Sequence, residues 1–469
     1  MTTGVLPGDE DTIVAVATAP GRGAVALVRL SGARAISIAR ALGAFGAMPA
    51  DAVEPRRTHL ATLRDPERGD RLDQALVTAF VAPRSYTGDD VVEFATHGGA
   101  VSCALVMAAC VAAGARPAAP GEFTRRAVLN GRMDLLQAEA VADLVDARTR
   151  AMQREALAQL DGGLSRRLLA LRDEVIHLEA LLAYDIDFPE EDDGPIAPAR
   201  IARAAHTLLD ALNALLLTAP RGAMVRDGVL VVIAGPPNAG KSSLFNALLG
   251  EARAIVTAVA GTTRDAIEAL LDRGGALPLR LVDTAGLRDT DDEVEKLGIE
   301  VSSRYLAQAQ VVLACGASPE DVAHTCVVVR AHTTATVVPV HTKCDLRQSG
   351  DATDGASDRA SDSAGIEVSA ESGAGLADLL ARIDGAAHEA VPASPHDSVI
   401  ITRERHRAGL TLARDEVAAF ARAWDTGALP APVAAVHLLA AREAIADLIG
   451  SVDTEDVLDR VFRDFCIGK

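Results

Sequence analysis

The residues best suited to chemistry lie in a glycine-rich loop near the middle of the chain. The apolar run at residues 229–234 predicts a buried strand, and it leads into Gly235-Pro-Pro-Asn-Ala-Gly-Lys-Ser242 and then an apolar-periodic helix. In this strand–loop–helix context the pattern is typical of a phosphate-binding loop. Its glycines let backbone N–H groups surround a phosphate, Lys241 reaches the phosphate oxygens, and Ser242 offers a Mg²⁺ ligand. The alternative, a glycine-rich turn without function, is disfavoured by the flanking elements.

Two segments after this loop have the features of nucleotide-sensing loops. Asp283-Thr-Ala-Gly286 ends a second apolar strand, so Asp283 is suited to hold Mg²⁺ through water and Gly286 to reach a γ-phosphate. Between the two loops, Gly261-Thr-Thr contains Thr263, which we expect to close over Mg²⁺ as part of a switch loop.

Two later segments predict guanine recognition. Thr342-Lys-Cys-Asp345 ends another strand, and the Asp345 carboxylate can accept from the N1–H and amino groups of guanine, which adenine does not offer. Ser369 and Ala370 end the last strand, which supports the base in such folds. Each motif alone is weak, but five in the right order predict a GTPase. The expected GTP-binding positions in these motifs are Asn238, Ala239, Gly240, Lys241, Ser242, Ser243, Gly261, Thr262, Thr263, Asp283, Thr284, Ala285, Gly286, Thr342, Lys343, Asp345, Ser369 and Ala370, and the family resemblance given below adds Thr257, Ala258, Val259 and Ala260.

The position after the Asp-x-x-Gly motif holds Leu287, where Ras-like proteins carry a glutamine that orients water. An apolar side chain cannot position water, so catalysis requires another device. GTPases with this substitution commonly use K⁺ to neutralise charge between the phosphates. Asn238 is the typical ligand of that potassium-using group.

Composition restricts the class of protein further. The chain has 469 residues, which at about 150 per domain indicates about three domains. Its net charge of -19 argues against a general nucleic-acid coat or a membrane-surface binder, and the six cysteines lack C-x-x-C spacing, which indicates reduced thiols in a cytosolic protein. The longest apolar run, residues 100–115, is shorter than the ~20 residues of a membrane span and predicts a buried helix.

Hydropathy patterns predict the elements that position these residues. Residues 10–130 mix short strand patterns (12–17, 24–30, 75–81, 91–95) with helices near 33–42 and 100–113. Helical periodicity covers 132–182 and 198–218, and strand-rich α/β character covers 229–384. Within the latter, the serine-rich stretch 348–364 predicts a flexible insertion. Further helices are predicted at 402–423, 432–449 and 453–462. The predicted fold is multidomain, with an α+β N-terminal domain (1–130), a split α-helical domain (131–227 and 389–469) and an inserted Ras-like α/β P-loop GTPase domain (228–388).

The full set of motifs resembles the MnmE (TrmE) family of bacterial and organellar tRNA-modification GTPases. The resemblance rests on segments spread over almost the whole chain, and a GTPase domain inserted into a split helical domain is also that family's architecture. The matching segments outside the GTPase motifs include Pro20-Gly-Arg-Gly, Tyr86-Thr-Gly-Asp-Asp-Val-Val-Glu93, Pro120-Gly-Glu-Phe-Thr-Arg-Arg-Ala, Asn130-Gly-Arg-Met-Asp-Leu-Leu-Gln-Ala-Glu139 and Phe465-Cys-Ile-Gly-Lys469.

The resemblance implies a homodimer formed through an N-terminal domain that binds a one-carbon donor, 5,10-methylene- or 5-formyl-tetrahydrofolate. The corresponding folate-binding positions are Arg29, Glu93, Arg132 and Lys469, with Arg132 standing where a lysine is expected. Without the family, the alternative is that Arg29 and Glu93 are ordinary strand residues, because nothing in their local spacing is diagnostic.

The resemblance also implies roles for Cys466 and for the GTPase ions. Cys466 would take part in tRNA modification; the alternatives are a prenylation box, which the last two residues fit poorly, and a tail cysteine with no role. Lys241 and Glu295 would be catalytic, Glu295 by orienting water, although sequence alone favours one of several solvated acids there. The implied metal ligands are Ser242 and Thr263 for Mg²⁺ and Asn238, Thr257, Val259 and Thr262 for K⁺.

The implied function is K⁺-dependent GTP hydrolysis coupled to modification of C5 of the wobble uridine, position 34, in certain tRNAs. The implied partner is MnmG (GidA), which carries the FAD and joins a heterotetramer or larger complex in the cytoplasm, without a membrane. The GTPase motifs also occur in proteins with two other functions. A ribosome-assembly GTPase usually appends a basic RNA module, which this sequence does not show, and a one-carbon transferase with a regulatory nucleotide domain would turn over folate without tRNA.

Overall fold

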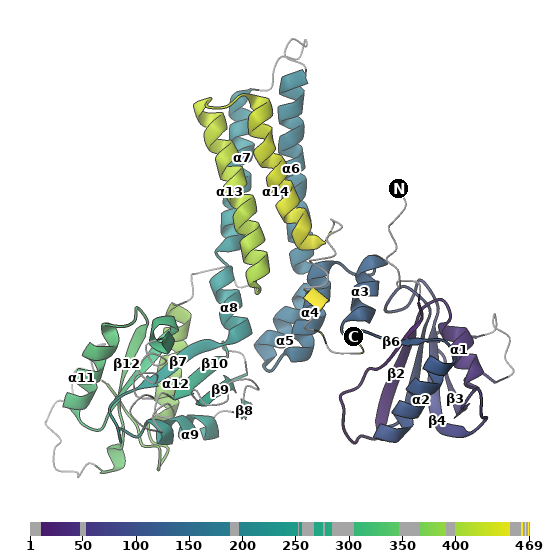
Figure 1. The fold of residues 1–469 in the computed structure, drawn as a ribbon. Coiled ribbons are helices and arrows are strands. Elements are labelled where there is room, and N and C mark those ends of the chain that lie inside the picture. Colours follow the sequence, from purple (N-terminus) through teal and green to yellow (C-terminus); the bar gives the residue numbers. More distant parts are fainter. Residues whose placement is uncertain are drawn as a thin grey trace, which may run out of the picture. The chain divides into compact units, whose positions relative to one another are not determined.

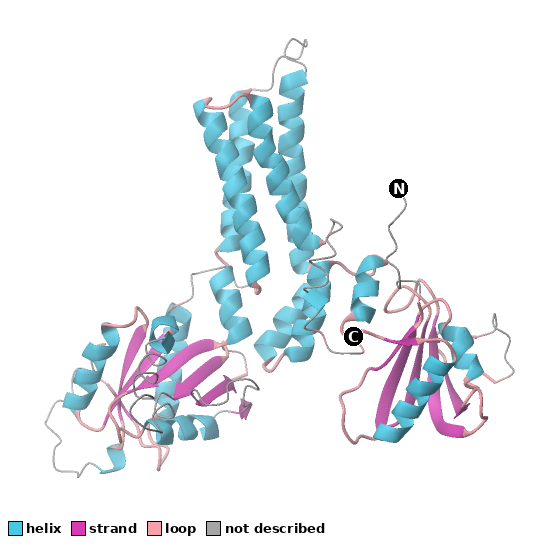
Figure 2. Ribbon diagram, viewed as in Figure 1, coloured by secondary structure: helices cyan, strands magenta, loops and turns pink. Residues whose placement is uncertain are grey.

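The structure is a computed structural model of the chain. It describes residues 11–46, 53–187, 197–251, 253–255, 267–274, 277–283, 304–346, 365–390, 399–450, 461–462, 465 and 468. The chain divides into two compact units, one of residues 1–142, 160–165 and 446–469 and the other of residues 143–159 and 166–445. Figure 2 shows that the strands gather in two sheets, one in each unit.

The first unit is built on a six-stranded sheet with the order β3-β4-β5-β2-β1-β6. Its neighbours are antiparallel except β1 and β6. Alternate side chains point to opposite faces, so Val14, Val28 and Phe94 pack with α1 and α2, while Ile13 packs with Phe123 on the other face. The elements are β1 (Ile13–Val16), β2 (Val25–Ser31), α1 (Ala35–Ala41), β3 (Thr58–Arg64), β4 (Arg71–Phe80), β5 (Val91–His97), α2 (Ala100–Ala112), β6 (Arg116–Pro117), α3 (Glu122–Leu129) and α4 (Leu135–Asp146).

Helix α2 corrects one expectation from the sequence. The apolar run at residues 100–115 does form a helix, but it is not buried all round: Val106 and Cys110 face the core, whereas the side chain of Val101 is 71% exposed and that of Leu105 44% exposed. A helix that lies on one face of a sheet buries only the stripe in contact with it. A uniformly apolar run hides that stripe from periodicity analysis.

The helices of the second unit include a bundle of α6, α7, α13 and α14, whose long axes lie side by side in Figure 1. His206 Nε2 lies 3.0 Å from Asp425 Oδ2, joining α7 to α13, and Arg442 donates to Glu179 at 3.0 Å, joining α14 to α6. The helices are α5 (Arg150–Leu160), α6 (Gly163–Asp187), α7 (Pro198–Leu216), α8 (Ala219–Asp227), α13 (Glu404–Thr426) and α14 (Ala431–Ile449).

One stretch of the described residues, Pro198–Asp227, is long and apolar enough by length and composition to cross a membrane. It comprises α7 and α8. Helix α7 begins at Pro198 and buries Ile201, Leu208 and Leu212 along one face while its other face stays polar. This one-sided burial is typical of a helix that packs into a helical bundle.

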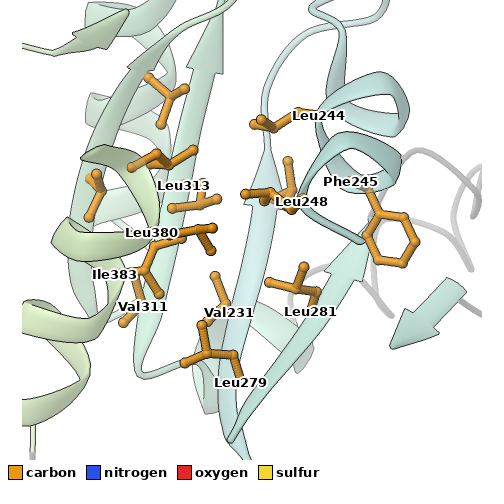
Figure 3. Packing of buried hydrophobic residues seen from close by; sticks show 14 of the residues in the cluster. Val231, Leu244, Phe245, Leu248, Leu279, Leu281, Val311, Leu313, Leu380 and Ile383 are labelled. Carbon is orange, nitrogen blue, oxygen red and sulfur yellow. The ribbon is translucent and has the colours of Figure 1, made fainter. Parts of the chain in front are cut away.

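The second sheet has seven strands in the order β13-β12-β11-β7-β10-β9-β8. The central strands are parallel, whereas β8, β9 and β10 pair antiparallel. Figure 3 shows Leu244 and Leu248 of α9 and Leu380 and Ile383 of α12 covering one face. The elements are β7 (Val229–Ala234), α9 (Lys241–Glu251), β8 (Arg253–Ile255), β9 (Ile267–Asp272), β10 (Leu279–Asp283), β11 (Val311–Gly316), α11 (Pro319–Arg330), β12 (Thr336–His341), the 3-10 turn η3 (Cys344–Leu346), β13 (Ile366–Glu367) and α12 (Leu376–Glu389).

Most predicted elements are confirmed. The helices expected at 198–218, 402–423 and 432–449 correspond to α7, α13 and α14. The helical stretch 132–182 is divided into α4, α5 and α6, and Gly162, with φ +77°, lies at the second break. Strand β3 and helix α3 were not predicted. The expected insertion at 348–364 and most of the helix at 453–462 lie outside the described residues.

Candidate functional site

The phosphate loop forms at the carboxyl end of β7, where the sequence places it. Burial of every residue of β7 fixes the strand, and α9 begins at Lys241. The Lys241 Nζ donates to the carbonyl oxygens of Gly235 at 3.1 Å and Pro236 at 2.9 Å. The lysine ammonium is therefore held across the loop, where it can reach the oxygens of a bound phosphate.

Position 235 requires a glycine because the fold leaves no room for a side chain there. A Cβ at this position would lie 2.4 Å from the carbonyl oxygen of Cys315 on the neighbouring strand β11. Burial raises the pKa of the Cys315 thiol to about 12, so this thiol stays neutral and adds no negative charge beside the phosphate loop.

Two of the nucleotide loops hold a non-glycine residue in the left-handed region. Asn238 has φ +63° and Lys343 has φ +58°, and the Lys343 Nζ donates to the Asn238 carbonyl at 2.8 Å. Backbone strain of this kind concentrates at functional sites, where surrounding contacts maintain it. The phosphate loop and the guanine loop are thus joined by a hydrogen bond between residues that are 105 positions apart in the sequence.

Thr342 makes a second connection between these loops. Its buried hydroxyl lies 2.6 Å from the Ala239 carbonyl and 3.1 Å from that of Gly316. The Gly316 carbonyl already accepts from the Thr342 backbone N–H at 2.9 Å. Since a hydroxyl has one hydrogen, it donates to Ala239. The sequence places Thr342 in the guanine motif, but only the fold shows its bond to Ala239.

A cavity of about 170 Å³ lies beside the guanine motif. Its lining includes Gly240 and Ser243 from the phosphate loop and α9, Lys343 and Asp345 from the guanine loop, and Ala370 after β13. The structure therefore brings together residues from three of the predicted motifs around one space beside the phosphate loop.

Asp283 stands at the carboxyl end of β10, whose register pairs it with Ile233 of β7. Parallel strands end at one edge of a sheet, so Asp283 and the phosphate loop share that edge. The other predicted residues of this region lie outside the described residues, which leaves their placement as a prediction: Thr257, Ala258, Val259, Ala260, Gly261, Thr262, Thr263, Thr284, Ala285, Gly286, Leu287 and Glu295.

A second group of predicted residues meets on the sheet of the first unit. Arg29 of β2 and Glu93 of β5 are register partners on one face, and the Arg29 guanidinium bonds the Glu93 carboxylate at 2.9 and 3.0 Å. The guanidinium also lies 5.2 Å from the centre of the Tyr86 ring and 5.7 Å from that of Phe123. Burial raises the pKa of Tyr86, whose hydroxyl lies 2.8 Å from Thr124 Oγ1.

The chain's C-terminal end reaches the same place. Arg29 Nη1 donates to the carbonyl of Gly468 at 3.2 Å, although 439 residues separate the two in sequence. Arg132 packs beside the loop that carries Tyr86, because a Cβ on Gly88 would lie 3.3 Å from Arg132 Cγ. Cys466 and Lys469 lie outside the described residues. Tyr86 and Phe123 were not singled out from the sequence, although both belong to the segments that match the family.

The parallel sheet, the phosphate loop at the end of β7 and the guanine-type loop bonded to it define the class of P-loop GTPases. Comparisons with known proteins give the family. A family model described as the MnmE helical domain matches residues 135–466, and one described as the GTP-binding protein TrmE N-terminus matches residues 12–132. The chain belongs to the MnmE family of tRNA modification GTPases.

Relatives of full length support this assignment. The tRNA modification GTPase MnmE of Methylobacterium radiotolerans is 44% identical, with 98% of this chain and 100% of the relative covered. The MnmE of Azoarcus sp. is 41% identical, with 99% of each covered. Among solved structures, the G domain of the T. maritima FeoB iron transporter matches with a TM-score of 0.25 and 23% identity, covering 34% of this chain and 98% of that chain. A score this low adds nothing to the sequence relatives.

Proposed function

We propose that this GTPase acts with the FAD-carrying protein MnmG to install an aminomethyl or carboxymethylaminomethyl group on C5 of the wobble uridine, position 34, of certain tRNAs. Family membership over the full length supports the reaction. The observation that carries the proposal is the convergence of Arg29, Glu93 and the C-terminal Gly468 on one sheet face. A nucleotide domain alone does not require such a site.

The Arg29–Glu93 face fits a folate. A carboxylate can bind the amino and ring N–H groups of a pterin, and cations can bind the carboxylates of its glutamate tail. We assign Arg29, Glu93, Arg132 and Lys469 to 5,10-methylene- or 5-formyl-tetrahydrofolate, which supplies the one-carbon unit. Tyr86 and Phe123 hold the Arg29 guanidinium in place, so the face is formed before any ligand binds. Cys466 is assigned to the same reaction.

The nucleotide loops fit GTP with Mg²⁺ and K⁺. Ser242 is exposed at the start of α9 and is assigned to Mg²⁺ together with Thr263. The Asn238 side chain is exposed and makes no hydrogen bond to the described residues, so its amide oxygen can bind a cation. We assign Asn238, Thr257, Val259 and Thr262 to K⁺, which supplies positive charge at the phosphates.

Hydrolysis then drives the conformational cycle of a cytoplasmic homodimer. The G domains pair across the dimer when K⁺ and GTP are bound, and their separation after hydrolysis moves the helices. Glu295 orients the attacking water and Lys241 stabilises the phosphate charge. Changing Glu295→Gln should slow single-turnover hydrolysis about tenfold or more with little loss of GTP affinity. Unchanged single-turnover rates would remove Glu295 from the mechanism.

The decisive test of the function is mass analysis of wobble uridines from a strain that lacks this gene. The modified uridine should disappear and return with the wild-type gene, but not with Lys241→Ala. Normal modification in the deletion strain would refute the proposed function. In vitro, replacing K⁺ by Na⁺ should reduce GTP hydrolysis, and Asn238→Ala should abolish the difference between the two ions.

A further inference from the structure

Two phenylalanines near the C-terminus pack into the first unit. The side chains of Phe462 and Phe465 are 3% and 9% exposed, and their ring centres lie 5.0 Å apart. They join one apolar cluster with Leu135 and Ala138 of α4. Burial of two aromatic rings makes this contact the main attachment of the described tail residues.

Gly121 lies directly against these two phenylalanines. It stands at the N-terminal cap of α3 with φ +67°. A Cβ there would lie 2.9 Å from Phe465 Cβ, 3.0 Å from Phe462 Cδ1 and 3.1 Å from Phe462 Cβ. All three of these closest atoms belong to the two phenylalanines, and two are Cβ atoms. Truncating the rings would therefore not make room for a side chain at position 121, because alanine keeps its Cβ.

The tail has a second contact three residues further on. The buried Gly468, with φ +97°, lies so close to β1 that a Cβ would be 2.6 Å from the Val16 carbonyl oxygen and 2.8 Å from Ala17 Cα. Its own carbonyl accepts from Arg29. The tail is thus held at Phe465 by apolar packing and at Gly468 by a hydrogen bond from Arg29, which also pairs with Glu93.

We propose that Gly121, Phe462 and Phe465 form a tail seat that positions the C-terminal residues at the Arg29–Glu93 face. Gly121 and Phe465 are positioning residues for tRNA modification, since neither lies at the ligand face itself. The role in modification rests on the proposed function, whereas the seat rests only on the contacts described here. Ordering a chain terminus costs conformational entropy, so the tail needs contacts that offset this cost. The single hydrogen bond from Arg29 contributes little, and burial of the two phenylalanine rings contributes more.

The test compares Gly121→Ala with Gly69→Ala in the full-length chain. Gly69 has φ +73° and lies in the same unit, but a Cβ there meets nothing within 4 Å. Both variants carry the left-handed penalty, and only Gly121→Ala adds the clash with the tail. Chymotrypsin cleaves after phenylalanine, so the rate of cleavage after Phe462 and Phe465, followed by intact mass, reports seating. Cleavage should be at least about tenfold faster in Gly121→Ala than in Gly69→Ala.

Modification of tRNA by the variant chain with MnmG is the second readout. Gly121→Ala should reduce the modification rate at least about tenfold and leave GTP hydrolysis unchanged, because the nucleotide loops belong to the other unit. Phe465→Ala, which leaves the α3 cap intact, should reproduce this loss, and Phe465→Leu should recover part of it. The double variant Gly121→Ala/Phe465→Ala should be less impaired than the sum of the two, because each empties the same seat.

Equal cleavage rates in Gly121→Ala and Gly69→Ala would overturn the seat. Full modification by a chain whose tail is cleaved rapidly would overturn its positioning role. No modification by the unaltered chain with MnmG would instead refute the proposed function, and the cleavage rates would then still decide whether the seat exists.

Discussion

Replacing Thr342 by valine should weaken guanine nucleotide binding. Valine keeps the shape of threonine but lacks the hydroxyl that donates to the Ala239 carbonyl at 2.6 Å. That bond joins the guanine loop to the phosphate loop, and both must lie in place when GDP is bound. We expect bound nucleotide to fix both loops and to keep water from the Ala239 carbonyl, which has lost its donor in the variant. The cost of the lost bond therefore falls mainly on the bound state.

The size of the effect follows from the burial of this bond. Thr342 is 3% exposed, and a buried acceptor that loses its donor costs about 1–3 kcal/mol. Since 1.4 kcal/mol corresponds to a factor of ten, the Kd for GDP should rise about tenfold. Thr342→Asn should bind GDP at least as tightly as wild type, because an amide has two hydrogens to donate where the hydroxyl has one.

Titration of a fluorescent GDP analogue measures these affinities, and Thr218→Val is the matched control. Thr218 is also 3% exposed and donates its hydroxyl to a carbonyl at 2.6 Å, that of Leu215, but it lies between α7 and α8 and contacts none of the nucleotide loops in these bonds. Thr218→Val should leave GDP affinity unchanged while lowering stability. If Thr342→Val binds GDP within twofold of Thr218→Val, the bond between the loops does not contribute to nucleotide binding and the reasoning fails.

Three further outcomes are expected. Gly235→Ala should lose more than about tenfold in GTP affinity, measured by titration, because its Cβ would lie 2.4 Å from a carbonyl oxygen. Its control, Gly250→Ala, has open space around the new Cβ within α9 and should raise the free energy of unfolding by up to about 1 kcal/mol, measured by thermal unfolding. Burial acts to raise the pKa of Glu122, but the hydrogen bonds from Arg116 and from the Ala119 N–H outweigh burial and lower the pKa from 4.5. The ionised Glu122 carboxylate therefore stabilises the fold above about pH 4.5, and this stabilisation is lost as the pH falls through the pKa of the folded protein. The difference in urea stability between wild type and Glu122→Gln should shrink as the pH is lowered, and a difference that stays constant would contradict this prediction. Cys315, with its pKa raised to about 12, should resist iodoacetamide at pH 8 until the protein unfolds, and labelling at the rate of an exposed thiol would exclude the buried placement.

Local patterns predicted the elements that depend on local physics. The apolar run of β7 and the glycine spacing after it specify a buried strand, a tight loop and a helix without reference to the rest of the chain. Helix α7 likewise shows its apolar stripe in its periodicity. Helix α3 escaped prediction because it is only eight residues long and contains two arginines, one of them buried against Asp89 and Glu122.

The sequence by itself determined the class of this protein, through a phosphate loop and the segments that identify the family, and it predicted a carboxylate that binds guanine. Only the tertiary structure decided which of these residues meet. The bond from Thr342 to Ala239 spans 103 residues and that from Arg29 to Gly468 spans 439, and no periodicity encodes such distances. The apolar face of α2 that stays exposed and the glycine that fits beneath Phe465 are also products of packing, because burial and close approach depend on which surfaces the fold brings into contact.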